Sequence, residues 1–233
     1  MPIRAVIVDF DGTACLHDVG VDLLDRFGID ASRNRELAGI DEAFDAGRIG
    51  LRDVLVAEAA TLRADDDELI AFALAHCPLD PTFAPFVAWA ENQDVPITVV
   101  SDGFGLLVRP LLEAAGLDHL PVVTNTWDRG ALAFGAAHPV CVGCGTCKKQ
   151  AVERGREAYG AVAFVGDGVS DRLGARYADV TFAKDDLAEH CRHASIPFLA
   201  YEDFDDVRIS LEQLDFAAGP LGGEPCPGWR EPA

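Results

Sequence analysis

Residues 6–16, VIVDFDGTACL, place two carboxylates directly after a run of apolar and β-branched residues. A run of this kind predicts a strand that is buried on both faces of a parallel sheet. Asp9 and Asp11 follow where the strand ends, and a buried carboxylate is costly to ionise unless another group neutralises it. The stretch therefore predicts a parallel α/β fold and raises the question of what the two acids do.

Two further segments repeat the pattern of an apolar run followed by polar residues and glycine. They are PITVVSDGFG, residues 96–105, and AVAFVGDGVSD, residues 161–171. Ligands of open α/β sheets bind outside the carboxyl ends of the strands, so the three polar clusters belong to one candidate site. The expected core is a doubly wound, Rossmann-like parallel sheet, with residues 180–182 and 196–200 as further short strands.

Helical periodicity fills the intervals between these runs. Phe83, Phe86, Val87 and Ala90 form one apolar face, and residues 152–160 predict a helix that stops at a glycine.

Residues 16–80 contain no comparable strand pattern and predict an all-helical insertion, a cap. The expected core comprises residues 1–15 and 81–216, and a Pro/Gly-rich tail covers residues 217–233. The three apolar stripes of the insertion are Leu37, Ile40 and Phe44; Leu51, Val54, Leu55 and Leu62; and Leu69, Ile70 and residues 72–74.

Composition limits the class of protein. The 233 residues are 49% hydrophobic and 25% charged, which is typical of a soluble globular chain with a full core. A formal net charge of −20 argues against nucleic acid or an anionic membrane as partner. No apolar stretch reaches the length of a membrane span, and the N-terminus enters a strand-like run at once. A cytoplasmic location is therefore expected, and seven cysteines, an odd number, make a disulfide framework unlikely. The expected assembly is a monomer or homodimer, a choice that the sequence leaves open.

Asp9, Asp11, Asp167 and Asp171 are expected to converge at the ends of adjacent strands. Four carboxylates in one crevice repel each other unless a hard cation lies among them. Proteins hold Mg²⁺ with one or two carboxylates together with phosphate oxygens and water. The acids therefore predict a magnesium site.

The other two clusters supply groups that bind phosphate. Ser101 offers a hydroxyl next to the backbone amides of Asp102 and Gly103, and Lys148 or Lys149 offers a cation. Lys148 is favoured because it opens the predicted helix. A small phosphorylated metabolite is the expected partner.

Two carboxylates two positions apart can divide the work of phosphate ester hydrolysis. Positions i and i+2 lie on the same face of an extended segment, which suits Asp9 as nucleophile and Asp11 as acid and base. Attack of Asp9 on phosphorus would give an aspartyl phosphate that water then hydrolyses. The metal and the lysine would stabilise the charge on the transferring group.

The ordered set DFDGT, SDGF, a lysine at a helix start and GDGVSD resembles the four motifs of the haloacid dehalogenase superfamily. Most members of that superfamily are Mg-dependent phosphatases, and the helical insertion is similar to its first type of cap, found in phosphoserine phosphatases. The resemblance implies Asp9 as nucleophile, Asp11 as acid, base and main-chain metal ligand, Asp167 as direct metal ligand, Asp171 as support of the metal site, Ser101 as phosphate ligand, and Lys148 as bridge between nucleophile and phosphate.

A closer resemblance concerns the segments CKKQAV, residues 147–152, and FAKDDLAEHCRHASIPFLAYEDFDDV, residues 182–207. Both are similar to the methionine-salvage phosphatases, which act on a methylthio enol phosphate. Phosphoserine phosphatases, the alternative subgroup, usually carry Asn where this chain has Ser170. A phosphomutase of the same superfamily is a further reading. From a different class, a phospho-accepting receiver domain gathers similar residues but needs neither Asp11 nor a cap.

His138, Cys141, Cys144 and Cys147 lie just before Lys148 and could hold zinc, although four ligands within ten residues would need a tight wrap. The alternative is a glycine-rich flap with reduced thiols. In the insertion, His17, Asp18, Arg48 and Arg52 could contact a leaving group or simply face water.

Overall fold

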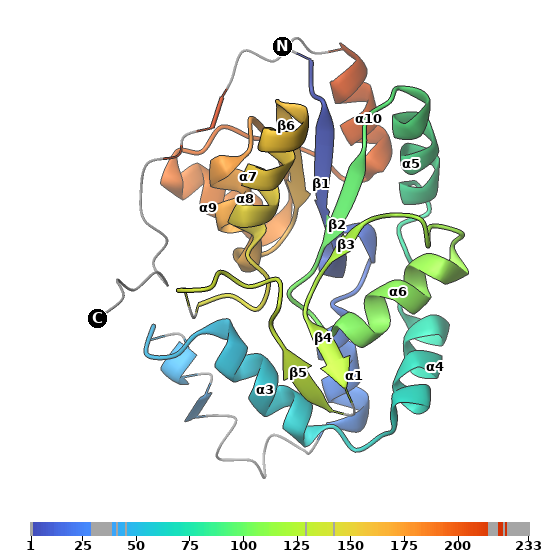
Figure 1. Cartoon of the computed structure of the whole chain (residues 1–233), viewed down its shortest axis with the longest axis vertical. Helices are drawn as coiled ribbons and strands as arrows, with labels where there is room; N and C mark the ends of the chain where they lie inside the picture. Colours follow the sequence, from blue (N-terminus) through green and yellow to red (C-terminus); the bar gives the residue numbers. More distant parts are fainter. Residues whose placement is uncertain are drawn as a thin grey trace.

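The computed structural model describes residues 2–28, 39–40, 42–44, 46–128, 130–141, 143–213, 219–220 and 222. Its centre is a six-stranded parallel sheet with the order β3-β2-β1-β6-β7-β8 (Figure 1). The predicted doubly wound parallel sheet is confirmed. The strands are β1 (Ala5–Asp9), β2 (Ile97–Val100), β3 (Val122–Val123), β6 (Val162–Gly166), β7 (Val180–Ala183) and β8 (Leu199–Ala200).

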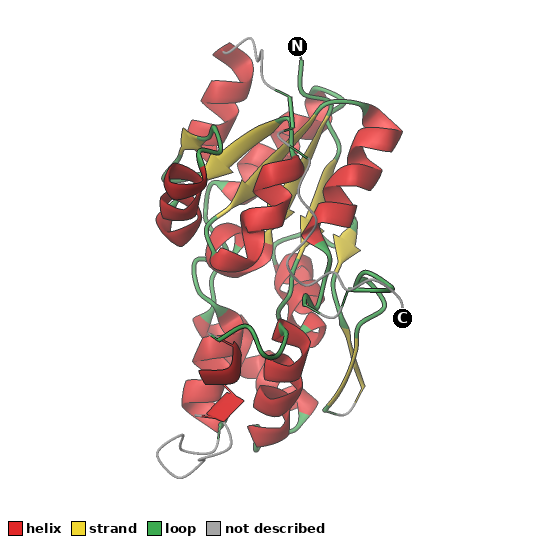
Figure 2. Ribbon diagram, turned by 90° about the vertical axis from the view of Figure 1, so that its left-hand side faces the viewer, coloured by secondary structure: helices red, strands yellow, loops and turns green. Residues whose placement is uncertain are grey.

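Helices cover both faces of this sheet (Figure 2). Successive residues of β1 point to opposite faces: Val6 and Val8 join one hydrophobic cluster with α5 and α6, whereas Ala5 and Ile7 join another with α7 and α9. Among the described residues, no helix is long and apolar enough to cross a membrane. The helices of the sheet are α5 (Phe83–Asn92), α6 (Gly105–Ala114), α7 (Lys148–Tyr159), α8 (Arg172–Tyr177), α9 (Asp185–Ala194) and α10 (Phe204–Gln213).

A second group of helices lies beyond the carboxyl ends of the strands, in the lower part of Figure 1. It contains α1 (Val19–Phe27), α3 (Leu51–Thr61) and α4 (Asp66–His76). An antiparallel bridge between Cys15 and Leu79 joins the two chain segments that enter and leave this group. The boundaries proposed for core and cap stay a prediction; Leu37 and most of residues 217–233 lie outside the described residues.

A short hairpin that the sequence did not predict packs against the helical group. It consists of β4 (Thr126–Asp128) and β5 (Ala131–Ala133), and β5 lies against α3. The Trp127 indole N–H donates to Asp66 Oδ1 at the start of α4, at 2.8 Å. The wall opposite the sheet is therefore built from two separate parts of the chain.

Candidate active site

The first acidic cluster lies in a tight turn rather than in an extended segment. Strand β1 ends at Asp9, and Phe10–Ala14 form one turn in which Gly12 has φ +73°. A Cβ on Gly12 would collide with the carboxylate of Asp167, so only glycine lets the turn approach the third cluster this closely. Strand β1 thus stops before Asp11, although both carboxylates still line the same cavity, as the i and i+2 spacing predicted.

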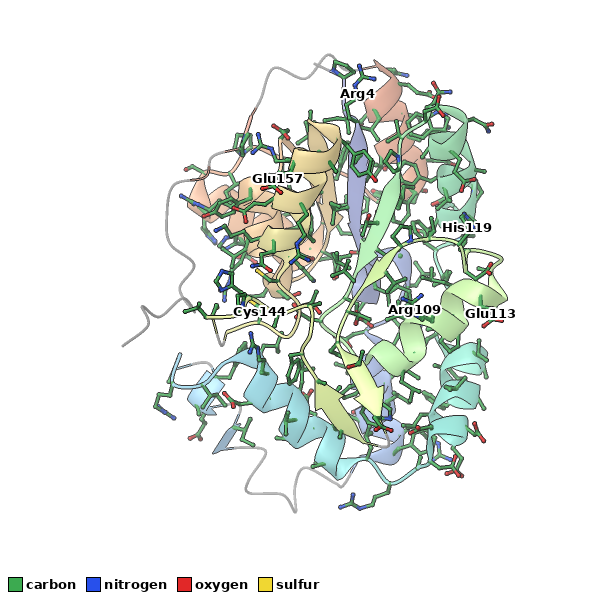
Figure 3. All side chains as sticks on the ribbon, viewed as in Figure 1. Arg4, Arg109, Glu113, His119, Cys144 and Glu157 are labelled. Atoms are coloured by element: carbon green, nitrogen blue, oxygen red, sulfur yellow. The ribbon has the colours of Figure 1, made fainter. Side chains whose placement is uncertain are left out.

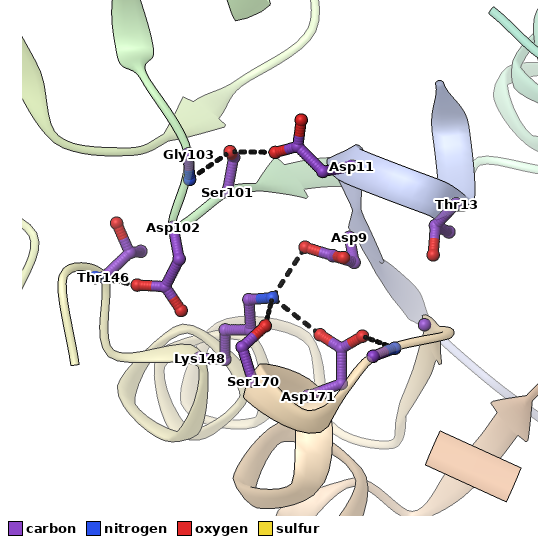
Figure 4. Close-up of polar contacts among 12 residues, drawn as sticks. Asp9, Asp11, Thr13, Ser101, Asp102, Gly103, Thr146, Lys148, Ser170 and Asp171 are labelled. Atoms are coloured by element: carbon purple, nitrogen blue, oxygen red, sulfur yellow. Dashed lines mark hydrogen bonds and ion pairs between the residues drawn. The ribbon is translucent and has the colours of Figure 1, made fainter. Parts of the chain in front are cut away.

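Lys148 is the buried cation at the centre of the site (Figure 4). Its Nζ donates to Asp9 Oδ1, Ser170 Oγ and Asp171 Oδ1, each at 2.7 Å. Burial by itself would lower the pKa of Lys148, but the charges of Asp171 and Asp9 raise it well above its usual value, so the ammonium stays charged. Lys149 instead pairs with Glu153 at 3.4 Å on the outer side of α7.

Asp9, Asp167 and Asp171 form a group of oxygens of metal-binding size. One carboxylate oxygen from each lies within 4.8 Å of the others. Asp171 is anchored, because its Oδ2 accepts from the amides of Asp167 and Gly168 at 3.0 Å. These hard oxygen donors fit Mg²⁺.

Asp167 is held by a hydroxyl on the first turn. Thr13 Oγ1 donates to Asp167 Oδ1 at 2.6 Å, and burial raises the pKa of Asp167 to about 6. Burial likewise raises the pKa of Asp9, while the Lys148 ammonium opposes that rise. Carboxylates gathered this closely repel one another, and a bound cation would offset that repulsion.

Asp11 is set apart from this group. Its Oδ2 accepts from Ser101 Oγ at 3.0 Å, and its Oδ1 accepts from the amide of Val19 at 3.2 Å. Burial, with the nearby charge of Asp18, raises the pKa of Asp11 to about 7. A carboxyl with a pKa near neutrality can both give and take a proton, which is what an acid and base requires.

The second cluster forms a turn around the Ser101 hydroxyl. Gly103 donates its amide to Ser101 Oγ at 3.0 Å, and a Cβ on Gly103 would lie 2.6 Å from Asp11 Oδ2. Asn125 holds the turn, since its side-chain amide donates to the carbonyls of Asp102 and Gly103. The Asp102 side chain faces away from Ser101 and accepts from the amide of Thr146 (Figure 4).

These groups open into a cavity of about 380 Å³ between the sheet and the helical group. Its apolar lining comes from Val21, Leu24, Leu51, Leu55, Phe104 and Val169. Lys148 is the single cation among the described lining residues. The acidic lining residues are Asp9, Asp11, Asp18, Glu58, Asp102, Asp167 and Asp186.

Among the described residues, only Asp9, Asp167 and Asp171 bring three possible metal-ligand atoms within 4.8 Å of one another. The zinc hypothesis for His138, Cys141, Cys144 and Cys147 stays a prediction. His138 Nδ1 accepts from the amides of Val140 and Cys141 at 3.2 and 3.1 Å. Figure 3 shows Cys144 in the segment before α7, at a position in space between α3 and α7.

Of the polar candidates in the insertion, only Asp18 lines the cavity. Asp18 also caps α1 by accepting from the amide of Val21 at 3.0 Å. His17 pairs with Asp22 at 2.6 Å, Arg48 is exposed, and Arg52 binds backbone carbonyls of the segment before Lys148.

Sequence reasoning did not assign roles to three residues that shape the site: Thr13, Asn125 and Ser170. Thr13 and Ser170 lie inside the motifs DFDGT and GDGVSD, where a hydroxyl residue close to an acid could have indicated a hydrogen-bonding role in the site. Asn125 follows a two-residue strand and lies 22 residues beyond the turn it holds, so no local pattern pointed to it.

The carboxyl edge of a parallel sheet gathers acids and a serine next to a buried lysine at the start of α7, and a helical wall covers them; this arrangement is that of an α/β enzyme site. The chain belongs to the haloacid dehalogenase-like hydrolase family, which it matches over residues 6–176. The predicted resemblance to this superfamily is confirmed.

Three known proteins that are similar to this chain are named as phosphatases or their analogues. A 2-hydroxy-3-keto-5-methylthiopentenyl-1-phosphate phosphatase of Bacillus velezensis is 24% identical over 217 residues, covering 90% of either chain. The polyol phosphate phosphatase PYP1 of Saccharomyces cerevisiae is 26% identical, covering 91% of this chain and 94% of the yeast protein. A solved structure of a phospho-aspartyl intermediate analogue of phosphoserine phosphatase has a TM-score of 0.66 at 17% identity, covering 92% of this chain and 100% of that one, which shows a shared fold.

Proposed function

We propose that this hydrolase is a Mg²⁺-dependent phosphatase that cleaves a small phosphomonoester through an aspartyl phosphate on Asp9. The observation that carries the proposal is the contact of the buried Lys148 ammonium with Asp9, beside an Asp11 carboxyl whose pKa is about 7. One acid is thereby kept close to a permanent cation, and the other is free to exchange protons.

The chemistry follows from these two environments. A carboxylate oxygen of Asp9 attacks phosphorus while the bond from phosphorus to the ester oxygen breaks, and protonated Asp11 gives that oxygen its proton. Water then attacks the phosphorus of the aspartyl phosphate while Asp11 takes a proton from that water, and the bond from phosphorus to the Asp9 oxygen breaks to give phosphate and free Asp9. Bound Mg²⁺, held by Asp9, Asp167 and the main-chain oxygen of Asp11 with Asp171 in support, would supply positive charge for the phosphate oxygens.

Lys148 and Ser101 hold the transferring group in place. The ammonium of Lys148 neutralises charge as it builds up on the phosphoryl oxygens, in a site where burial strengthens that interaction. Ser101 Oγ and the amide of Gly103, which are bonded to each other at 3.0 Å in this structure, can both turn to phosphate oxygens.

The cavity favours a leaving group without a negative charge. Its described lining carries seven acids against one cation, and that cation is already bonded to Asp9 and Asp171. A substrate carboxylate would meet repulsion in this lining, whereas hydroxyl, keto or thioether groups would not. The methylthiopentenyl and polyol phosphates named for two relatives fit this description, and phosphoserine does not.

A phosphate-release screen tests the proposal. The panel contains a methylthio enol phosphate, a polyol phosphate, phosphoserine and an aryl phosphate, each with Mg²⁺. We expect many turnovers per enzyme and a kcat/KM for the neutral substrates at least about tenfold above that for phosphoserine. A single turnover would indicate a receiver domain, and phosphate returned to the substrate would indicate a phosphomutase.

The Asp9→Asn variant tests the nucleophile in the same assay. Its amide is a poor nucleophile, so we expect no Mg-dependent turnover while the circular dichroism spectrum stays unchanged. Retained turnover would refute the role of Asp9, and a preference for phosphoserine would refute the proposed leaving group. A cytoplasmic location and a monomeric or dimeric state remain part of the proposal, to be checked by cell fractionation and by light scattering.

A further inference from the structure

Arg52, on the helical group, is bonded to the segment that leads into Lys148. We call residues 138–147 the cysteine-rich loop, of which all but Val142 are described. Arg52 Nε donates to the carbonyl of Cys144 at 2.7 Å, and its Nη2 donates to the carbonyls of His138, at 3.1 Å, and Cys141. A planar guanidinium is suited to join several carbonyls at once.

The start of α3 adds a backbone contact to the same loop. The amide of Leu51 donates to the carbonyl of Gly143 at 2.7 Å. Arg52 and Leu51 therefore attach one end of α3 to four carbonyls of the cysteine-rich loop. Arg52 is not among the described residues that line the cavity, and its guanidinium donates to backbone carbonyls of the loop. A direct role in substrate binding is therefore not indicated.

The far end of the loop is bonded to the catalytic core. The amide of Thr146 donates to the buried Asp102 carboxylate, next to Ser101, and the amide of Cys147 donates to the carbonyl of Ala136 at 3.0 Å. At Gly145 the loop is confined from both sides: a Cβ there would lie 3.0 Å from Asp102 Oδ1 and 3.0 Å from Leu55 Cδ1 of α3. The next residue after Cys147 is Lys148.

We propose that Arg52 is a positioning residue for catalysis. By holding the cysteine-rich loop against α3, it fixes the backbone that presents Lys148 to Asp9 and the loop amide that anchors Asp102. The geometry of the site then depends on α3 being seated over it. The inference rests on the proposed function for its effect on turnover, but the attachment of the loop can be measured without any substrate.

The experiment compares Arg52→Ala and Arg52→Lys with a matched control, Arg63→Ala. Arg63 also donates to carbonyls, those of Ala60 and Leu62 at 3.0 Å, but it does so at the exposed opposite end of α3. We expect Arg52→Ala to lower kcat for an aryl phosphate by about 100-fold, with KM changed less than about threefold, because a small displacement of Lys148 disturbs the reacting geometry more than binding. The kcat of Arg52→Lys should lie between those of Arg52→Ala and the native enzyme. Added guanidinium should partly restore the kcat of Arg52→Ala, and the kcat of Arg63→Ala should equal the native value.

Hydrogen exchange provides the readout that needs no activity. In Arg52→Ala, the amides of Gly143, Thr146 and Cys147 should exchange at least about tenfold faster than in the native protein, while amides of β1 and β6 keep their protection. Unchanged exchange in the loop would overturn the inference. Faster exchange with native kcat would also overturn it, since Lys148 would not depend on the loop.

The two proposals fail in different ways. If the native protein hydrolyses no phosphomonoester, the proposed function is wrong and the exchange data alone decide whether Arg52 holds the loop. If Arg52→Ala loses kcat without faster loop exchange, Arg52 acts on substrate directly and the positioning role is refuted.

Discussion

At the scale of single residues, the site is a set of charges that compensate one another. Lys148 and Asp171 are almost fully buried, and burial of either alone would be strongly unfavourable. Ser170 Oγ completes the hydrogen bonding of the ammonium at 2.7 Å. Ser170, which stands where phosphoserine phosphatases usually carry Asn, therefore helps to hold the Lys148 ammonium. This residue argues against the phosphoserine phosphatase subgroup but is compatible with phosphatase chemistry.

Removing Lys148 should affect both stability and turnover. In Lys148→Met the carboxylates of Asp9 and Asp171 lose their cation at the centre of the site, so we expect the metal-free protein to lose about 3–5 kcal/mol of unfolding free energy. Turnover of an aryl phosphate should fall at least about 100-fold, since the charge that stabilises the transferring group is gone. Urea unfolding and phosphate release measure the two effects.

Lys149→Met is the matched control for this variant. Lys149 pairs with the half-exposed Glu153, an interaction worth at most about 0.5 kcal/mol on a helix surface. Both properties should stay near native. If Lys149→Met lost turnover while Lys148→Met kept native turnover, the catalytic lysine would be Lys149 and not Lys148.

At the scale of helices and strands, long periodic segments were predictable and short ones were not. The apolar runs gave β1, β2, β6 and β7, and the stripe Phe83, Phe86, Val87 and Ala90 gave the buried face of α5. The hairpin β4–β5 was missed because its strands are three residues each and are partly exposed. The turn after Asp9 was missed because the letters VDFD alternate as a strand does, and only the approach to Asp167 requires the turn.

Helix α4 illustrates a local signal that can be tested by itself. Asp65 accepts from the amide of Glu68 at 2.9 Å, and Glu68 accepts from the amide of Asp65 at 3.1 Å, a reciprocal capping box. Asp65→Ala removes the first of these bonds, and we expect it to lower the unfolding free energy by about 1 kcal/mol. The neighbouring Asp67→Ala removes a charge from the same turn without a cap bond and should change it by less than about 0.5 kcal/mol. Equal losses in urea unfolding would show that charge, rather than capping, matters at this helix start.

At the scale of the whole molecule, the catalytic residues were predictable to the extent that they lie on strand ends. The sheet brings Asp9, Ser101 and Asp167 together because parallel strands end at one edge, which the sequence order already implied. The cavity wall has no such rule. Arg52 meets carbonyls 86, 89 and 92 positions further along the chain, and this pairing exists only in the folded molecule. Substrate preference therefore depends on the assembled cavity.

Because the net charge is −20 and the cavity is acidic, we expect a bound metal ion to raise the unfolding free energy of the whole protein. Mg²⁺ that binds the native state alone should raise the unfolding free energy by about 2.7 kcal/mol at 100 times its Kd. Asp167→Asn should abolish most of this gain, and without metal it should be at least as stable as the native protein, because an amide removes a carboxylate whose pKa burial raises to about 6. The control variant Asp186→Asn, which changes an exposed acid of the same cavity, should keep the gain.

Urea unfolding with MgCl₂, compared with NaCl of equal ionic strength, separates site binding from screening of the acidic surface. An equal effect of the two salts on the native protein would mean that Asp9, Asp167 and Asp171 do not hold a cation.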